Sequence, residues 1–167
     1  MNIRTNKIMS QTLGERDHDF KQQSVTLPDE LKELVDSGIS EEQGCILVKD
    51  FQYSEPGQLD SDLRRTEYEV FINAIHISDY ISEPSEEFEY LKVGLELGKQ
   101  IYTRLTQQYQ SDFRVTVSFS ETVYAGHEID TYGDCVVKFH KVRPSCEDKF
   151  KLENLEEFET EGVLVIE

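Results

Sequence analysis

The stretch from Tyr124 to His140 gathers side chains that could bind a ligand, a metal ion or another protein. Histidine and carboxylate groups hold zinc or iron when three or four of them converge. The candidate binding residues are Tyr124, His127, Glu128, Asp130, Tyr132, Asp134 and His140. Their spacing matches no metal signature, because His127-Glu128 lacks the second histidine of HExxH. We therefore predict no metal and no cofactor. The stretch is either a plain surface loop or a binding loop for a protein partner.

A second candidate surface is a group of acidic residues at the start of a predicted long helix, namely Glu83, Glu86, Glu87 and Glu89. Acidic side chains stabilise a helix N-terminus by about 0.3–1 kcal/mol each, so the group has an ordinary structural explanation. An acidic docking patch is the alternative.

Signatures of catalysis are missing from the sequence. It contains no GxxxxGK[ST], GxGxxG or GxSxG motif. Cys135 alternates with Val137 and Phe139, which predicts an inward, buried thiol. On one strand Cys135 and His140 would point to opposite faces, so they do not form a nucleophile pair. We assign no catalytic residue and expect a protein that is not an enzyme.

The formal net charge of -17 is unevenly distributed along the 167 residues. Residues 29–96 hold 18 acidic and five basic residues, and residues 144–167 hold eight and two, whereas residues 97–143 are nearly balanced. Binding to nucleic acid or anionic membranes requires a basic surface, so we expect neither. The acidity favours a basic protein partner, although it also serves solubility.

Length and cysteine usage indicate a cytoplasmic protein with a single folded domain. The three cysteines are odd in number and form no CxxC pair, which favours reduced thiols. No signal peptide and no apolar run of about 18 residues is visible. Residues 1–24 are polar and lack a hydrophobic period, so we predict a mobile arm there and one α+β domain over residues 25–167.

The first half of that domain is predicted to contain a helix and two strands. A helix begins at Pro28, buries Leu31, Leu34 and Val35, and ends at Ser37-Gly38. Residues 45–53 form a strand. Residues 63–78 alternate imperfectly between polar and apolar side chains, which favours a long strand.

The second half contains the clearest element, a helix over residues 84–110 with apolar side chains every three or four positions. Gly94 and Gly98 within it indicate close approach by a neighbouring element. Residues 112–120 and 135–142 are predicted to form an antiparallel hairpin with an elaborate tip. A short helical stretch around residues 152–158 and a buried strand over residues 162–166 follow.

These elements predict the α+β class: an antiparallel or mixed sheet of about five strands packed on one long central helix, with one or two short helices. By size and charge alone, the chain is analogous to acidic inhibitors and immunity proteins that cover a basic active site. The leading hypothesis is therefore a non-enzymatic acidic binding protein. The alternatives are a small enzyme or ligand- or metal-binding domain with a site in residues 124–140, and a homodimer formed through residues 97–143.

Overall fold

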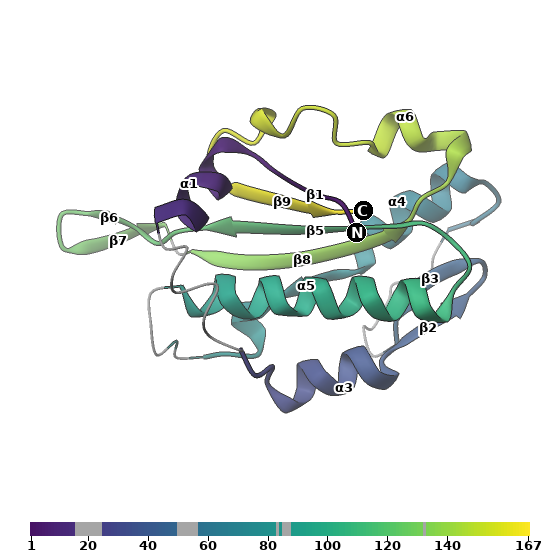
Figure 1. The fold of residues 1–167 in the computed structure, drawn as a ribbon, viewed down its shortest axis with the longest axis horizontal. Helices are drawn as coiled ribbons and strands as arrows, with labels where there is room; N and C mark the ends of the chain where they lie inside the picture. The colour runs from purple at the N-terminus through teal and green to yellow at the C-terminus, as the bar shows by residue number, and fades with distance from the viewer. Residues whose placement is uncertain (16–24, 50–56, 83, 85–87, 132) are drawn as a thin grey trace.

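The structure is a computed structural model that describes residues 1–15, 25–49, 57–82, 84, 88–131 and 133–167. Its centre is a five-stranded antiparallel sheet with the order β1-β9-β5-β8-β4. The strands are β1 (Ile3–Thr5), β4 (Ala74–His76), β5 (Phe113–Ser120), β8 (Asp134–Lys141) and β9 (Gly162–Ile166). A single long helix, α5 (Glu89–Gln108), lies along one face of this sheet among the described residues (Figure 1). The predicted fold class is confirmed.

The α5 helix packs tightly on β5 and β8. Leu91, Leu97 and Ile101 are fully buried. Glycines remove the bulk that would otherwise hold the layers apart. A Cβ on Gly94 would overlap the sulfur of Cys135, and one on Gly98 would lie 2.9 Å from a methyl of Val117. The predicted close approach is thus confirmed, with β8 and β5 as the neighbours.

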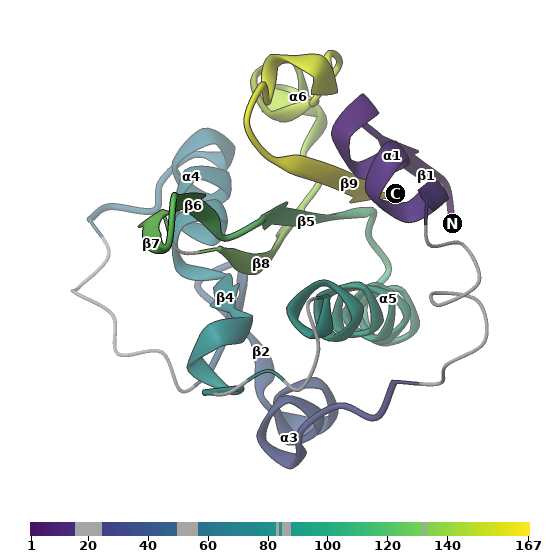
Figure 2. The same ribbon diagram turned by 90° about the vertical axis from the view of Figure 1, so that its left-hand side faces the viewer.

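The opposite face of the sheet carries the C-terminal segment (Figure 2). After β8 this segment forms the short elements η2 (Pro144–Cys146), α6 (Glu147–Phe150) and η3 (Leu155–Glu157). Leu155 packs with Val163 and Val165, while Leu164 and Ile166 of the same strand join the core beneath. Because both faces of β9 are covered, all five of its residues are buried, as the apolar run predicts.

The predicted helix after Pro28 is confirmed as α3 (Asp29–Ser37), with Gly38 as its C-cap. A hairpin of β2 (Ile39–Glu42) and β3 (Cys45–Val48) follows, and its turn uses positive φ angles at Gln43 and Gly44. The strand predicted over residues 45–53 is therefore confirmed for its first four residues, and residues 50–53 lie outside the described residues.

The long strand predicted over residues 63–78 is wrong. This stretch forms the helix α4 (Asp62–Ile72), the short strand β4 and the 3-10 turn η1 (Ile77–Asp79). Ser61 caps the helix by accepting a hydrogen bond from the Arg64 backbone N–H. The buried side chains Thr66, Glu69 and Ile72 recur every three residues, a helical spacing. The alternation misleads because one of these buried residues is a glutamate.

Residues 3–15 also differ from the prediction of a mobile arm. They form β1, which pairs with β9, and the helix α1 (Lys7–Glu15), in which Met9 is fully buried. Buried Asn6 joins α1 to β9: its side-chain oxygen accepts hydrogen bonds from the backbone N–H groups of Met9 and Val163. Met9, partly buried Leu13 and this amide help to hold the segment, a combination that leaves no clear hydrophobic period. Residues 16–24 of the predicted arm lie outside the described residues.

Candidate functional site

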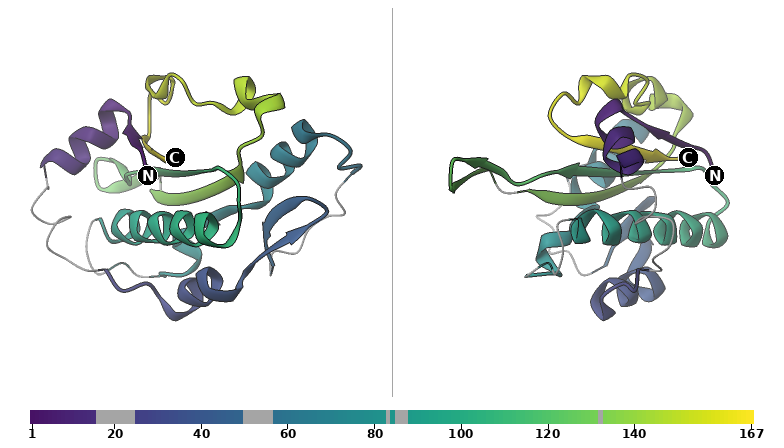
Figure 3. Two further views of the ribbon diagram at one scale, coloured as in Figure 1. Left: turned by 45° about the vertical axis from the view of Figure 1, so that its right-hand side comes forward. Right: turned by 60° about the vertical axis from the view of Figure 1, so that its left-hand side comes forward.

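The predicted hairpin of β5 and β8 is confirmed, and its tip is a separate two-stranded sheet. This sheet consists of β6 (Val123–Ala125) and β7 (Glu128–Thr131), and it projects beyond the end of the main sheet (Figures 1 and 3). We call residues 121–131 the β6–β7 ribbon. Residues 121–130 are all exposed, so no other described part of the chain buries them.

The turn and the strand pairing determine which ribbon side chains share a face. Gly126 has a φ of +70°, as the first position of a type II′ hairpin turn requires. Tyr124 pairs directly with Ile129, and Ala125 pairs with Glu128. Residues paired across strands lie on the same face, and neighbours along a strand alternate. Tyr124 and Ile129 therefore occupy one face.

Large apolar side chains on this ribbon remain in contact with solvent. Relative exposure is 51% for Val123, 61% for Tyr124 and 41% for Ile129. Single exposed apolar residues are common on protein surfaces, but two of these three, Tyr124 and Ile129, are paired on one face of a projecting element, which makes the ribbon a candidate interaction site.

Carboxylates accompany these apolar groups. The ribbon contains Glu121, Glu128 and Asp130, and no lysine or arginine occurs between Arg114 and Lys138. The stretch is therefore locally acidic although residues 97–143 as a whole are nearly neutral.

Hydrogen bonds at the base of the ribbon fix its connection to the sheet. Asp134 accepts hydrogen bonds from the backbone N–H groups of Ser78 and Cys135, and its second oxygen lies 2.6 Å from Nδ1 of His76. The Gly133 N–H donates to the Thr122 hydroxyl, and a Cβ at this glycine would overlap backbone atoms of residues 120–122. Asp134 and Gly133 thus have structural roles.

His140 is not part of the ribbon. It lies near the other end of β8, six residues from Asp134, which is about 20 Å along a strand. It is 6% exposed, its ring is 5.9 Å from that of Phe150, and its Nε2 has no hydrogen-bond partner among the described residues. Burial, together with the nearby guanidinium groups of Arg114 and Arg143, lowers the pKa of His140 to about 4. The imidazole is therefore neutral at pH 7.

Of the other candidate residues, His127 lies in the ribbon turn and Tyr132 lies outside the described residues. The candidate acidic patch is described only at Glu89, the first residue of α5, while Glu83, Glu86 and Glu87 lie outside the described residues. The structure thus brings together Tyr124, His127, Glu128 and Asp130, and it separates His140 from them.

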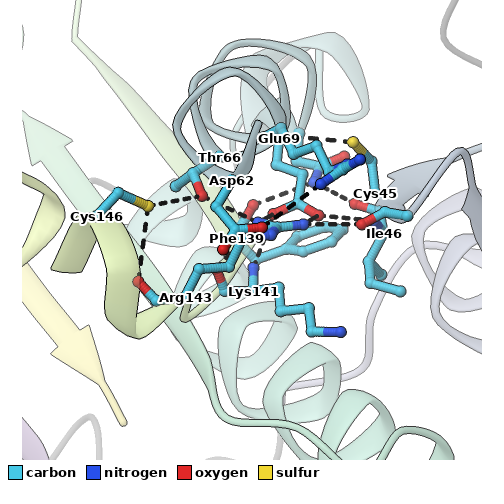
Figure 4. A network of polar contacts seen from close by, with 12 residues as sticks. Cys45, Ile46, Asp62, Thr66, Glu69, Phe139, Lys141, Arg143 and Cys146 are labelled. Carbon is cyan, nitrogen blue, oxygen red and sulfur yellow. Dashed lines mark hydrogen bonds and ion pairs between the residues drawn. The ribbon is translucent and has the colours of Figure 1, made fainter. Parts of the chain in front are cut away.

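A buried polar cluster that the sequence analysis missed lies between α4, β3 and β8 (Figure 4). Glu69, fully buried, accepts two hydrogen bonds of 2.8 Å from the Arg143 guanidinium and others from the backbone N–H groups of Ile46 and Lys141. Arg143 also donates to the carbonyl of Gly44. Together these contacts tie α4, the β2–β3 hairpin and the end of β8 to one another, so the cluster is structural.

No group of three or more His, Cys, Asp or Glu side chains arranged to hold a metal ion occurs among the described residues. Two surface hollows flank α3, and residues 124–140 line neither of them. In the described part of the chain, no helix combines the length and the apolar character needed to cross a membrane.

Comparisons with known proteins locate the chain by family. No curated protein and no solved structure matches it significantly. A family model does match, over residues 4–167, which is nearly the whole chain and includes both the sheet and the ribbon. The chain belongs to the Uncharacterized protein PM0498 family.

Proposed function

We propose that this chain is a non-enzymatic binding protein, of the inhibitor or immunity type, that captures a basic protein through the β6–β7 ribbon. The observation that carries the proposal is the exposure of Val123, Tyr124 and Ile129 on a projecting element that also bears carboxylates. Burying such side chains favours association, because each contributes roughly 1.5–3 kcal/mol when it leaves water completely.

Charge supports a basic partner. A net charge of -17 speeds the encounter with a positively charged protein and opposes binding to acidic ones. The Lys and Arg residues that would be needed to hold nucleic acid or an anionic membrane are absent from the ribbon.

We further propose a cytoplasmic location, where thiols stay reduced. Cys45, Cys135 and Cys146 are all free. Burial raises the pKa of the Cys45 thiol to about 11 and also raises that of Cys135, so both thiols are protonated and unreactive at neutral pH.

Site-specific photo-crosslinking tests the proposal. A benzophenone amino acid replaces Tyr124 in one variant and Thr106, exposed on α5, in the control. In cells that express the full chain, we expect the Tyr124 variant alone to form an adduct with a protein of net positive charge. The association rate of that protein should fall at least about tenfold between low and high salt. Equal labelling at both positions, or an association rate independent of salt, would contradict the proposal.

A further inference from the structure

We infer that Tyr124 and Ile129, on one face of the β6–β7 ribbon, enter an apolar pocket on the partner, while the neighbouring carboxylates of Glu128 and Asp130 meet lysine and arginine side chains at its rim. This inference rests on the proposed function and specifies the kind of surface that the partner must present.

The strand register supplies the separation. Tyr124 and Ile129 are direct cross-strand partners and share one face. Glu128 precedes Ile129 along β7 and pairs with Ala125, so strand alternation places its carboxylate on the other face. The register shift between Val123 and Tyr124 interrupts the alternation at Asp130, which lies between the partners of these two residues. The ribbon thus carries an apolar pair on one face with carboxylates close beside it, and it can contact two different kinds of surface at once.

The apolar pair has the properties of a binding hot spot. Tyrosine is enriched among residues that dominate binding energy, because its ring buries a large area with few rotatable bonds. The ribbon presents Tyr124 at 61% exposure at the tip of a hairpin, next to Ile129. Phe71 on α4 is more exposed, at 75%, but it lies within a helix that packs on β3 and β8 and does not project.

The position of the pair further favours insertion. The base of the ribbon is fixed by the contacts of Asp134 and by the close approach of Gly133 to residues 120–122. A fixed base reduces the conformational freedom that the ribbon loses on binding, which strengthens association. The carboxylates would then select a pocket surrounded by basic residues, since carboxylates over apolar or acidic surface are left without partners.

A second copy of this chain does not fit as the occupant. Each copy carries a net charge of -17, and the ribbons themselves are acidic, so two copies repel each other. Edge pairing with an extended peptide is the other alternative. It would use the backbone of β6 or β7, which offer only three and four residues. Such pairing would not depend on Tyr124 or Ile129 in particular.

Binding kinetics of four variants distinguish these roles. The probe is the recombinant protein identified in the Tyr124 adduct, and the full chain is immobilised. The double variant Tyr124→Ser/Ile129→Ser tests the apolar face, with Phe71→Ser as its matched control. The double variant Glu128→Gln/Asp130→Asn tests the two carboxylates. Its control, Glu30→Gln/Glu33→Gln on α3, removes the same charge from an exposed surface elsewhere.

We expect the apolar double variant to raise the dissociation rate by about 30-fold or more, with little change in association rate. The acidic double variant should lower the association rate about three- to tenfold and weaken its salt dependence. Both controls should stay within about twofold of wild type. Thermal unfolding verifies that all four variants are folded.

A dissociation rate within about twofold of wild type for the apolar double variant would overturn the inference while leaving the proposed function intact, because the partner would still bind through another feature of the ribbon. Failure to obtain any Tyr124 adduct would refute the proposed function and the inference together. Equal effects of the acidic double variant and its control would refute the role assigned to Glu128 and Asp130.

Discussion

The side chains of the Glu69–Arg143 cluster and those of the β6–β7 ribbon have opposite environments. In the cluster, polar groups are buried and find their partners inside the chain. In the ribbon, apolar groups are exposed and find none. The fold accounts for a buried carboxylate whose hydrogen bonds are all made within the chain, whereas it does not account for the exposure of Tyr124 beside Ile129. The burial of Glu69 is therefore structural, whereas we propose that the exposure of Tyr124 serves binding.

Removing the charge of Glu69 should have the largest effect on stability. The variant Glu69→Gln leaves the buried Arg143 guanidinium without its counter-charge, and breaking a buried ion pair in this way costs about 3–5 kcal/mol. Urea unfolding measures the loss. The matched substitution Glu128→Gln on the ribbon should change the free energy of unfolding by less than about 0.5 kcal/mol. Similar losses of unfolding free energy for both variants would contradict a structural role for Glu69 that Glu128 lacks.

His140 differs from Glu69 because it is a buried polar group whose Nε2 has no hydrogen-bond partner in the described part of the chain. Its pKa is lowered from 6.5 to about 4 in the folded chain, so the unfolded state binds the proton more readily. Stability should fall as pH decreases from about 6.5 to about 4, by at most about 3 kcal/mol from this residue. In His140→Phe this contribution should be missing. The measurement is urea unfolding of both proteins at several pH values, and parallel curves would show that His140 does not titrate in this way.

Strand β8 connects the ribbon to the Glu69–Arg143 cluster, and substitutions at its contact with α5 test how closely the two elements pack. Gly94→Ala places a methyl group against the Cys135 sulfur and should destabilise the protein by about 1–3 kcal/mol. Adding Cys135→Ala removes the overlapping sulfur and should restore part of the loss. Thermal unfolding of the single and double variants gives this coupling. Additive losses would mean that the helix and strand are farther apart than described.

Substitution within the ribbon should have the smallest effect on stability. Tyr124→Ser/Ile129→Ser changes two exposed residues and should alter the free energy of unfolding by less than about 0.5 kcal/mol. Chemical denaturation gives the value. A loss of 2 kcal/mol or so would indicate that these side chains pack within the chain and are unavailable to a partner.

The sequence could predict elements in which apolar spacing is regular. The α5 helix, the β5–β8 hairpin and the buried β9 strand are of this kind. Prediction failed where polar residues are buried: Asn6 joins α1 to β9, and Glu69 occupies the buried face of α4. A polar residue in a sequence is normally predicted to be exposed. Asn6 and Glu69 are buried because they bind partners that are distant in the sequence.

The candidate site could be predicted from the sequence only where its residues are close together along the chain. Residues 124–130 are neighbours in sequence, so local turn chemistry at Gly126 was enough to group them. His140 was grouped with them by composition, but a strand extends about 3.4 Å per residue and carries it away. The separation of Tyr124 from Glu128 onto different faces requires the register of β6 and β7.

Hydrogen–deuterium exchange of the full chain, with and without the protein captured at Tyr124, tests directly whether the β6–β7 ribbon is the binding surface. We predict that binding slows exchange in residues 121–131 and leaves residues 45–48 and 62–72, which surround the Glu69–Arg143 cluster, unchanged. Slower exchange around the cluster with no change in the ribbon would contradict the assignment of binding to the ribbon.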